Sequence, residues 1–455
     1  MALRLDPVGR VRAPGAALAL IASCQLILVV DASIVNVALP SIRSSLGFSP
    51  ENLSWVVNAY TLAFGGLLLL GGRAGDILGH RRVFVAGAVL FTLASLAGGF
   101  AMSPAWLLAA RAAQGVGAAF AGPASLALVA VTFEEGPRRA RALAVFSMAA
   151  SAGMVVGLVL GGVLTMWASW RWVLFVNVPV GGLVAVLAPR LVAESERLPG
   201  RFDLAGALTS TVGTSLLVYG FIRAARQGWG EGLTVAAFGG AVVLLAVFVV
   251  VEARARQPIM PLRLFAGRDR CGAYGMRLLL TAAMSGMLFF LTLFVQDVLG
   301  FSPLRTGLAF LPTTVALVAA SRAVPWLLPR WGARPVMVAG SVLCLAGMVW
   351  LTRVSAGSGS LTVLGPVLLF GAGTGLVAVA ATFVALSSVP RADSGAASGL
   401  LQGVQQVGGS LGVAVLVTVY ASARGSVAGI GDAFMAGVVF TACMVVIAAV
   451  GFARR

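Results

Sequence analysis

Long apolar runs separated by short polar segments follow one another along almost the whole chain. Each run holds about 20 residues, the length at which an α-helix crosses a hydrocarbon core of roughly 30 Å. Fourteen such runs are found, near residues 15–38, 53–71, 83–102, 105–132, 142–166, 172–192, 204–223, 233–251, 272–296, 306–328, 335–352, 361–387, 395–420 and 432–452. The pattern predicts an all-α membrane protein with fourteen membrane-spanning helices.

A short segment recurs in the two halves of the chain. Residues 79–87 and 332–340 are identical at six of nine positions, at an offset of 253 residues. A repeat of this kind indicates a duplicated membrane domain, an organisation typical of transporters. The offset exceeds a six-span half of roughly 190 residues, but it fits six spans plus an inserted pair. The sequence therefore predicts two six-span bundles, residues 1–193 and 271–455, joined by a linker with two inserted spans, residues 194–270.

Composition excludes several classes of protein. A mean hydropathy of +0.99 with only 10% charged residues would leave a soluble chain covered in apolar patches. The net charge is +17, but the arginines are dispersed between apolar runs, which argues against a nucleic-acid partner. All 32 basic residues are arginine, as a GC-rich bacterial genome would favour. We expect a multi-pass protein of the bacterial inner membrane, with the lipid bilayer as its surroundings.

The arginines also predict an orientation. They are concentrated in alternate connecting segments, beginning with the N-terminal tail, and this bias predicts that both termini are cytoplasmic. The first span is too long and too polar in its middle for a cleaved signal peptide. Three arginines fall within spans. Arg277 and Arg322 lie one to two turns from cytoplasmic ends and are expected to snorkel, whereas Arg111 is too deep for that.

Asp31 is the one acidic residue expected well inside a span. An unpaired carboxylate there would cost several kcal/mol, so Asp31 should be protonated, paired or functional. At about 1.5 Å per residue it lies roughly 24 Å from the cytoplasmic end of its span, and Arg111 lies at roughly 20 Å. We therefore predict that the two side chains interact and that Asp31 couples proton movement to conformation. A fixed structural ion pair and direct contact with a cationic substrate are the alternatives.

Other kinds of site find little support. The four cysteines fall inside or at the ends of spans, where they act as small apolar residues, and His80 is the only histidine. No metal and no cofactor are therefore expected, with the proton as coupling ion. The chain has no lysine and hence no phosphate-binding loop of the Gly-x-x-x-x-Gly-Lys type, which argues against ATP as the direct energy source. An enzyme would need paired catalytic groups within the spans, so none is expected.

Several motifs resemble those of the major facilitator superfamily. Residues 72–82 resemble its loop signature between spans 2 and 3, and residues 107–119 resemble its signature in span 4. Three further segments resemble the fourteen-span drug:proton antiporter branch of the family: residues 30–40, 170–172 and 175–179. In the second half of the chain the match extends to residues 296–303 and 402–409. The resemblance implies the major facilitator fold and a proton-coupled exporter of drugs or of an endogenous amphipathic natural product. A proton-coupled importer and a transport-inactive receptor are the alternatives.

The loop signature has a physical interpretation of its own as a conformational latch. Gly72 and Gly79 permit a tight turn, and Asp76 can cap a neighbouring helix N-terminus or pair with Arg81. Arg81 and Arg82 would anchor the cytoplasmic face. A purely static role in setting topology is the alternative. Two positions depart from the family pattern and predict a weaker latch, Ala74 and Ile77.

Span 5 carries glycines at positions i, i+4 and i+8, namely Gly153, Gly157 and Gly161, followed by Gly162. Without side chains on one helix face, another helix can approach closely. The stretch resembles the antiporter signature of the superfamily. Leu158 stands where that signature has proline, so a kink is less expected, and plain helix packing is the alternative.

Polar residues in the middle of spans are candidates for a substrate cavity, because a few polar groups in an apolar pocket suit an amphipathic organic molecule. We expect fewer than half of them to touch substrate. The polar candidates are Gln25, Asn36, Asn58, Thr61, Gln114, Gln402, Gln405 and Gln406, and the apolar ones are Phe64, Met148 and Phe289. The sequence leaves the substrate and the oligomeric state open.

Overall fold

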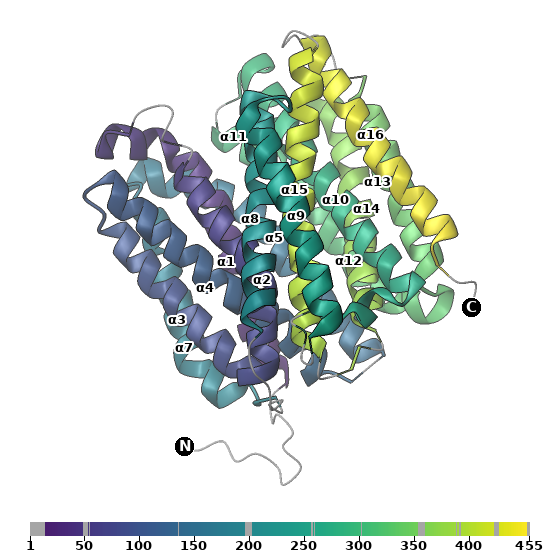
Figure 1. Ribbon diagram of the computed structural model, residues 1–455. Coiled ribbons are helices and arrows are strands. Elements are labelled where there is room, and N and C mark those ends of the chain that lie inside the picture. Colours follow the sequence, from purple (N-terminus) through teal and green to yellow (C-terminus); the bar gives the residue numbers. More distant parts are fainter. Residues whose placement is uncertain are drawn as a thin grey trace.

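The computed structural model describes residues 14–48, 53, 55–134, 136–195, 203–255, 258, 260–301, 303–353, 360–387, 389–390, 393–422 and 427–452, a few side chains within these ranges excepted. Every element in this part of the chain is helical. Figure 1 shows the helices from the first half of the chain on one side and those from the second half on the other. The predicted all-α architecture is confirmed.

The first group of helices comprises α1 (Pro14–Leu46), α2 (Trp55–Leu78), α3 (His80–Gly99), α4 (Pro104–Thr132), α5 (Pro137–Trp167), α6 (Trp172–Phe175) and α7 (Asn177–Leu191). Within it α1 packs on α5, and α4 packs on both α2 and α3. The helices are apolar around much of their circumference, so they are stable only when surrounded by other helices and lipid.

The second group comprises α10 (Arg268–Leu293), η2 (Phe294–Val298), α11 (Pro303–Ala309), α12 (Leu311–Trp331), α13 (Ala333–Leu351), α14 (Ser360–Leu386), α15 (Ser394–Ser422) and α16 (Val427–Val450). Its packing repeats that of the first group, because α14 packs on α12 and α13 as α4 packs on α2 and α3. The repeated glycines also match: Gly79 precedes α3 and Gly332 precedes α13, both with positive φ. Glycine is favoured at these two positions because residues with a side chain rarely adopt a positive φ.

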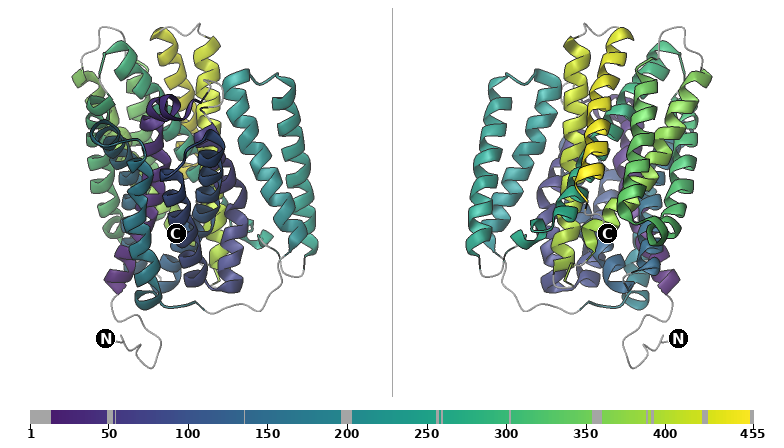
Figure 2. Two further views of the ribbon diagram at one scale, coloured as in Figure 1. Left: turned by 90° about the vertical axis from the view of Figure 1, so that its left-hand side faces the viewer. Right: turned by 90° about the vertical axis from the view of Figure 1, so that its right-hand side faces the viewer.

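Along the chain, three helices separate the two groups: α8 (Leu204–Gln227), α9 (Gly232–Arg254) and the short 3-10 helix η1 (Leu262–Phe265). Figure 2 shows α8 and α9 as a separate pair beside the main bundle. The pair contacts both groups through α8, which packs on α2 and α15. Trp229, in the turn between the pair, donates to Thr418 Oγ1 at 2.5 Å.

Glu231 fixes the turn between α8 and α9. Its carboxylate accepts from the backbone N–H of Thr234 at 2.8 Å, which caps α9, and pairs with Arg223 at 2.9 Å. The hydrogen bond from Arg223 lowers the pKa of Glu231 to about 2. The pair is only partly buried, so it orders the turn more than it stabilises the fold.

Thirteen described helices are long and apolar enough to span a membrane, and α5, which bends by 43° between Met154 and Val159, brings the number to fourteen. The described residues therefore hold 13 to 14 candidate spans, a range that includes the predicted fourteen. The bend is present although Leu158, whose side chain lies outside the described part, stands where the antiporter signature has proline. Glycine-rich helix segments bend without proline when close packing requires it.

The glycines of α5 let that helix lie close against α1. A Cβ added at Gly153 would lie 2.9 Å from the carbonyl oxygen of Leu26, and one at Gly161 would lie 2.8 Å from that of Ile34. A Cβ at Gly157 would collide with Ser33. Gly162 differs from the other three, because nothing lies within 4 Å of an added Cβ there. Three of the four predicted glycines thus form one packing face.

One boundary prediction was wrong. The sequence placed residues 72–82 in a loop, but α2 continues to Leu78, and only Gly79 separates it from α3. Arg73 and Asp76 look like loop residues in the sequence, yet they are buried inside the helix bundle, with 8% and 2% of their surface exposed. Consequently Asp31 is not alone within the spans, because Asp76 lies in the last turns of α2.

Candidate functional site

Asp31 on α1 and Arg111 on α4 form a buried ion pair. Arg111 Nη1 lies 2.6 Å from Asp31 Oδ2, and the two side chains are 1% and 0% exposed. The contact follows from the packing of α1 on α4, which brings two residues of similar depth together. An ion pair withdrawn from water is stable only if its remaining polar atoms also find partners.

Two amides complete the surroundings of Asp31. Its Oδ1 accepts from Asn177 Nδ2 at 2.6 Å and from Gln114 Nε2 at 3.0 Å. Gln114 Oε1 in turn accepts from Arg111 at 2.9 Å, and both amides also donate to Ser95 Oγ. The result is a buried polar network of five side chains inside the first group of helices.

The side chain of Arg111 is held from a second side by α2. Its Nε donates to the carbonyl oxygen of Val56 at 3.0 Å, and the guanidinium lies 4.5 Å from the centroid of the Tyr60 ring. The cation–π contact and the carbonyl lower the cost of burying the charge. Arg111 Nη2 is buried without a hydrogen-bond partner in the described part of the molecule. The guanidinium therefore depends on Asp31 for its only charged partner there.

Asp76 connects the two groups of helices. It lies near the end of α2, and its Oδ1 and Oδ2 accept from the backbone N–H groups of Gly395 and Ala396 at 2.8 and 3.1 Å. These residues belong to the first turn of α15, so a carboxylate of one group caps a helix of the other and meets the positive end of its dipole. Gly72 makes the approach possible, because a Cβ there would collide with Gly395.

The side chains next to Asp76 differ from those predicted. Arg73 Nη1 lies 3.7 Å from its Oδ2, and His80 Nε2 lies 3.4 Å from its Oδ1 and 3.0 Å from Ser394 Oγ. Of the two roles expected for Asp76, the structure shows the capping of a neighbouring helix N-terminus and not the pairing with Arg81. Arg81 points away because Glu194, beyond α7, accepts from its backbone N–H and lies 3.5 Å from its Nε.

Arg81 and Arg82 therefore tie α3 to the segment after α7. Arg82 Nε lies 3.6 Å from Glu194 Oε2, and Gly79 packs so tightly on the same carboxylate that a Cβ would lie 2.6 Å from it. Of the five predicted latch residues, only Gly72 and Asp76 have recorded contacts with the second group of helices.

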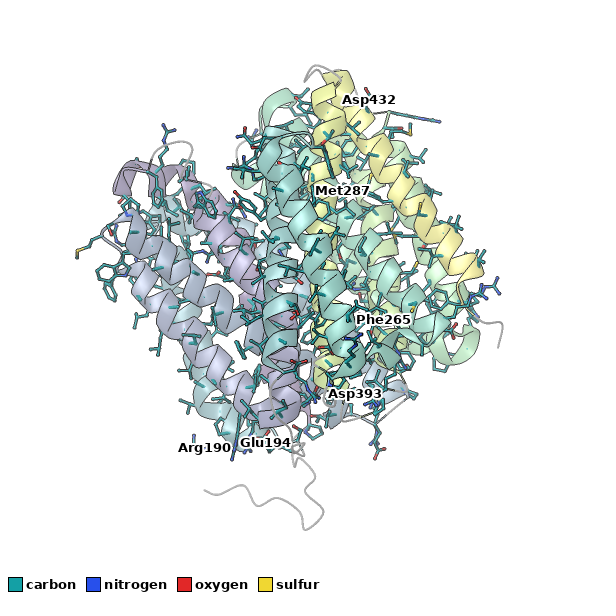
Figure 3. All side chains as sticks on the ribbon, viewed as in Figure 1. Arg190, Glu194, Phe265, Met287, Asp393 and Asp432 are labelled. Carbon is teal, nitrogen blue, oxygen red and sulfur yellow. The ribbon has the colours of Figure 1, made fainter. Side chains whose placement is uncertain are left out.

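Another ion pair lies at the same end of the molecule as Asp76. Arg263 of η1 donates two hydrogen bonds of 2.8 Å to Asp393, just before α15. The hydrogen bonds to Asp393 raise the pKa of Arg263. Figure 3 shows Asp393 and Glu194 at one end of the bundle and Asp432 at the other. The start of α15 is therefore held by Asp76 on one side and by Arg263 of η1 on the other.

A cavity of about 190 Å³ lies between the two groups of helices. Its wall includes residues of α1, α4 and α5 from the first group and of α10, α14 and α15 from the second. Three of the predicted polar residues, Gln25, Gln402 and Gln405, line it. Apolar side chains such as Phe146 and Met154 make up much of the rest, so the cavity suits an amphipathic molecule.

The other polar candidates lie elsewhere. Gln114 belongs to the Asp31 network, and Gln406 packs against Gly65 of α2. Asn36 is exposed and donates to the carbonyl oxygen of Ala32 in its own helix. Five further candidates, polar and apolar, are not among the described residues of the cavity wall: Asn58, Thr61, Phe64, Met148 and Phe289. A sequence shows that a residue lies at mid-span, but not which face of the helix it occupies.

Arg277 corrects a further expectation. Instead of snorkelling to the cytoplasmic end, its side chain lines the cavity and donates to Gln405 Oε1. The helix α10 begins at Arg268, nine residues earlier, so Arg277 lies about 13 Å along it. Arg322, the other arginine expected to snorkel, is exposed.

Within the described residues, no group of three or more histidine, cysteine or acidic side chains is placed to hold a metal ion. What the site does contain is a buried ion pair, a carboxylate that joins two groups of helices, and a cavity between those groups. An all-helical membrane protein built in this way has the architecture of a secondary transporter.

Sequence comparison supplies the family. The family model described as Major Facilitator Superfamily matches residues 21–413, so the chain belongs to this superfamily of transporters and is not an enzyme. A cephamycin export protein from Amycolatopsis lactamdurans is 45% identical over 443 residues, covering 95% of this chain and 91% of the relative. A puromycin resistance protein from Streptomyces alboniger is 42% identical, covering 88% and 81%. These relatives identify the fourteen-span drug-efflux branch of the superfamily.

Solved structures support the fold. The human organic anion transporter MFSD10 has a TM-score of 0.70 at 16% identity, with 96% of this chain and 99% of that chain covered. The proton:xylose symporter XylE has the same TM-score at 15% identity, with 96% and 94% covered. The predicted major facilitator fold is thereby confirmed.

Proposed function

We propose that the protein is a proton-coupled exporter of an antibiotic-like or drug-like amphipathic molecule. The observation that carries the proposal is the cavity of about 190 Å³ between the two groups of helices, because a binding site at such an interface is where alternating access operates. The relatives at 42–45% identity, a cephamycin export protein and a puromycin resistance protein, support outward transport.

Asp31 is the proposed proton carrier. Its carboxylate lies in α1, two residues after Val29, which faces the cavity. Protonation would remove the charge that Arg111 pairs with, and the network of Gln114, Asn177 and Ser95 would have to rearrange. A rearrangement of this network would alter the packing of α1 and α4, and both helices contribute to the cavity wall. Proton binding is thus coupled to the shape of the cavity.

Asp76 is the proposed conformational latch. Its hydrogen bonds to Gly395 and Ala396 exist only while α2 and α15 are in contact, so they favour the state in which this end of the molecule is closed. When the two groups rock apart, the N-terminus of α15 loses its cap. Such a contact sets the relative populations of the two states, while the cavity sets what is carried.

We further propose that the protein lies in the bacterial cytoplasmic membrane with both termini in the cytoplasm. The Asp76 end would then face the cytoplasm and be closed in the conformation described, with the cavity nearer to its outward-facing state. The concentration of arginine in the segments expected at that end supports this orientation.

Export is tested by expressing the chain in a strain that lacks its own efflux pumps. The expected result is lower susceptibility to some members of a panel of toxic amphipathic compounds, and reversal of the effect by an ionophore that collapses the proton gradient. The Asp31→Asn variant at equal membrane abundance is the matched control. Unchanged susceptibility across the panel, or protection that persists without a proton gradient, would contradict the proposal.

A further inference from the structure

We propose that Arg277 forms a subsite for a carboxylate or comparable anionic group of the transported molecule. The inference rests on the proposed function, since it names the chemical class of substrate that the cavity takes. It begins from a contrast between two intramembrane arginines. Arg111 has a carboxylate at 2.6 Å, whereas the recorded side-chain partner of Arg277 is the neutral amide of Gln405.

The described residues around Arg277 supply no negative charge. Its side chain lies in the wall of the cavity, and none of the described residues that line this cavity is acidic. No ion pair involving Arg277 is recorded within the described part of the chain, and its Nε is buried without a hydrogen-bond partner. A guanidinium in an apolar interior is costly without a counter-ion. An anionic ligand would provide that counter-ion.

Further unpaired polar atoms lie in the same wall. Gln25 and Gln402 are each 9% exposed, and Gln25 Oε1 and Gln402 Nε2 have no hydrogen-bond partner among the described residues. Buried amides normally use their donors and acceptors, so unused ones facing a cavity indicate a ligand or water. Gln402 Nε2 would add a donor for the anionic group, and Gln25 Oε1 would accept from a hydroxyl or amide on the same molecule.

The remainder of the wall indicates what the anion is attached to. Phe146, Met154 and Met284 offer apolar and polarisable surface to a ring system. A volume of about 190 Å³ is below the range of roughly 300–1,000 Å³ for sites that enclose a drug-sized molecule. The cavity in this conformation therefore fits a small aromatic acid, or the acidic end of a larger molecule.

The test uses two probes of nearly equal size and shape, the anion 1-naphthaleneacetate and its neutral amide, 1-naphthaleneacetamide. Binding of each is measured on the full chain in lipid nanodiscs by equilibrium dialysis. Wild type should bind the acid more tightly than the amide. Arg277→Gln should lose roughly 10- to 100-fold in affinity for the acid, the range that a hydrogen bond to a charged group contributes, and keep its affinity for the amide.

Two further variants separate charge recognition from packing. Arg322→Gln removes an exposed intramembrane arginine and should change neither affinity. Arg277→Lys retains a charge without the planar donor fork, so part of the preference for the acid should remain. Equal loss of both probes in Arg277→Gln would mean that Arg277 only holds α10 against α15 and would overturn the subsite. Equal or tighter binding of the amide by wild type would also overturn it.

Failure of this proposal is distinguishable from failure of the proposed function. Binding in nanodiscs requires neither a proton gradient nor a direction of transport. Selective binding of the acid with no change in drug susceptibility would support the subsite and contradict export. Export of neutral and cationic compounds, with no loss of acid binding in Arg277→Gln, would support export and contradict the subsite.

Discussion

The guanidinium of Arg111 lies 2.6 Å from the carboxylate of Asp31, and no more than 1% of either side chain is exposed. Three groups donate to this carboxylate, from Arg111, Gln114 and Asn177. The pair is thus part of a network within one group of helices and does not line the cavity wall. A side chain in this position can carry a proton while taking no direct part in substrate binding, and this separation allows the two functions to be tested independently.

Asp31→Asn should abolish uphill transport while leaving substrate binding measurable. Asparagine retains the size and one acceptor of aspartate but cannot release a proton near neutral pH. The measurement is uptake of an identified substrate into proteoliposomes with an imposed pH gradient, alongside binding in the same preparation. Undiminished uphill transport by the variant would rule out Asp31 as the proton site.

Arg111→Gln should be inactive and should also lower stability. Removing one partner of a buried ion pair costs about 3–5 kcal/mol because the other charge is left uncompensated. The double variant Asp31→Asn with Arg111→Gln removes both charges, so it should be more thermostable than Arg111→Gln alone yet still uncoupled. Thermal unfolding in detergent and transport in proteoliposomes give the two readouts. A double variant that is no more stable than the single one would mean that the charges do not stabilise each other.

The position of Asp31 was predictable from the sequence because depth along a helix follows from counting residues. Asp31 and Arg111 are in contact, as their similar depth predicts. The contact between Asn177 and Asp31 could not be predicted, because the two residues lie 146 positions apart along the chain. In the sequence Asn177 is only part of a motif. Which face of each helix turns inward depends on the packing of all its neighbours. This is why Gln114 was assigned to the substrate cavity and is found beside Asp31.

Asp76→Asn should insert normally into the membrane and transport more slowly. Both carboxylate oxygens accept from backbone N–H groups of α15, and an amide replaces one acceptor by a donor that cannot bond to them. Loss of a helix cap costs about 0.5–2 kcal/mol, which corresponds to a several-fold change in the populations of the two states. Transport rate and surface abundance are measured together.

Glu231→Gln is the matched control for Asp76→Asn. Glu231 also caps a helix, but it does so within the α8–α9 pair and pairs with Arg223 of the same pair. Its substitution should leave the transport rate unchanged. Wild-type transport by Asp76→Asn would mean that this contact has no part in the conformational cycle, and an equal loss in Glu231→Gln would mean that any helix cap has the same effect.

Hydropathy does not predict the environment of three charged residues, Arg73, Asp76 and Arg277. When spans are assigned from hydropathy, charged residues mark their ends, so the sequence predicts that α2 ends near residue 71. It likewise predicts that the side chain of Arg277 extends to the membrane surface. In the structure Asp76 accepts from the N-terminus of α15, and Arg277 donates to Gln405. Both partners lie more than 100 residues away along the chain, and local sequence carries no information about them.

Gly157→Ala should destabilise the protein, whereas Gly162→Ala should not. A Cβ at Gly157 would lie 2.8 Å from the carbonyl oxygen of Val30 and would collide with the hydroxyl of Ser33, so α5 would have to move away from α1. Overpacking of this kind costs about 1–3 kcal/mol. Nothing lies within 4 Å of a Cβ at Gly162, and alanine favours the helical state there. Thermal unfolding of the two variants in one detergent decides the matter, and equal midpoints would contradict the proposed packing face.

The orientation in the membrane is tested with reporters whose activity depends on the compartment. Fusions after Arg141, near the start of α5, and after Arg270, near the start of α10, should report the cytoplasm. A fusion near Gly228, in the turn between α8 and α9, should report the outside, because α8 crosses the membrane once between Asp203 and that turn. The reason is electrostatic: short arginine-rich segments are retained in the cytoplasm during insertion. An external position for either of the first two fusions would invert the orientation proposed for the Asp76 end and, with it, the assignment of the cavity as nearer to its outward-facing state.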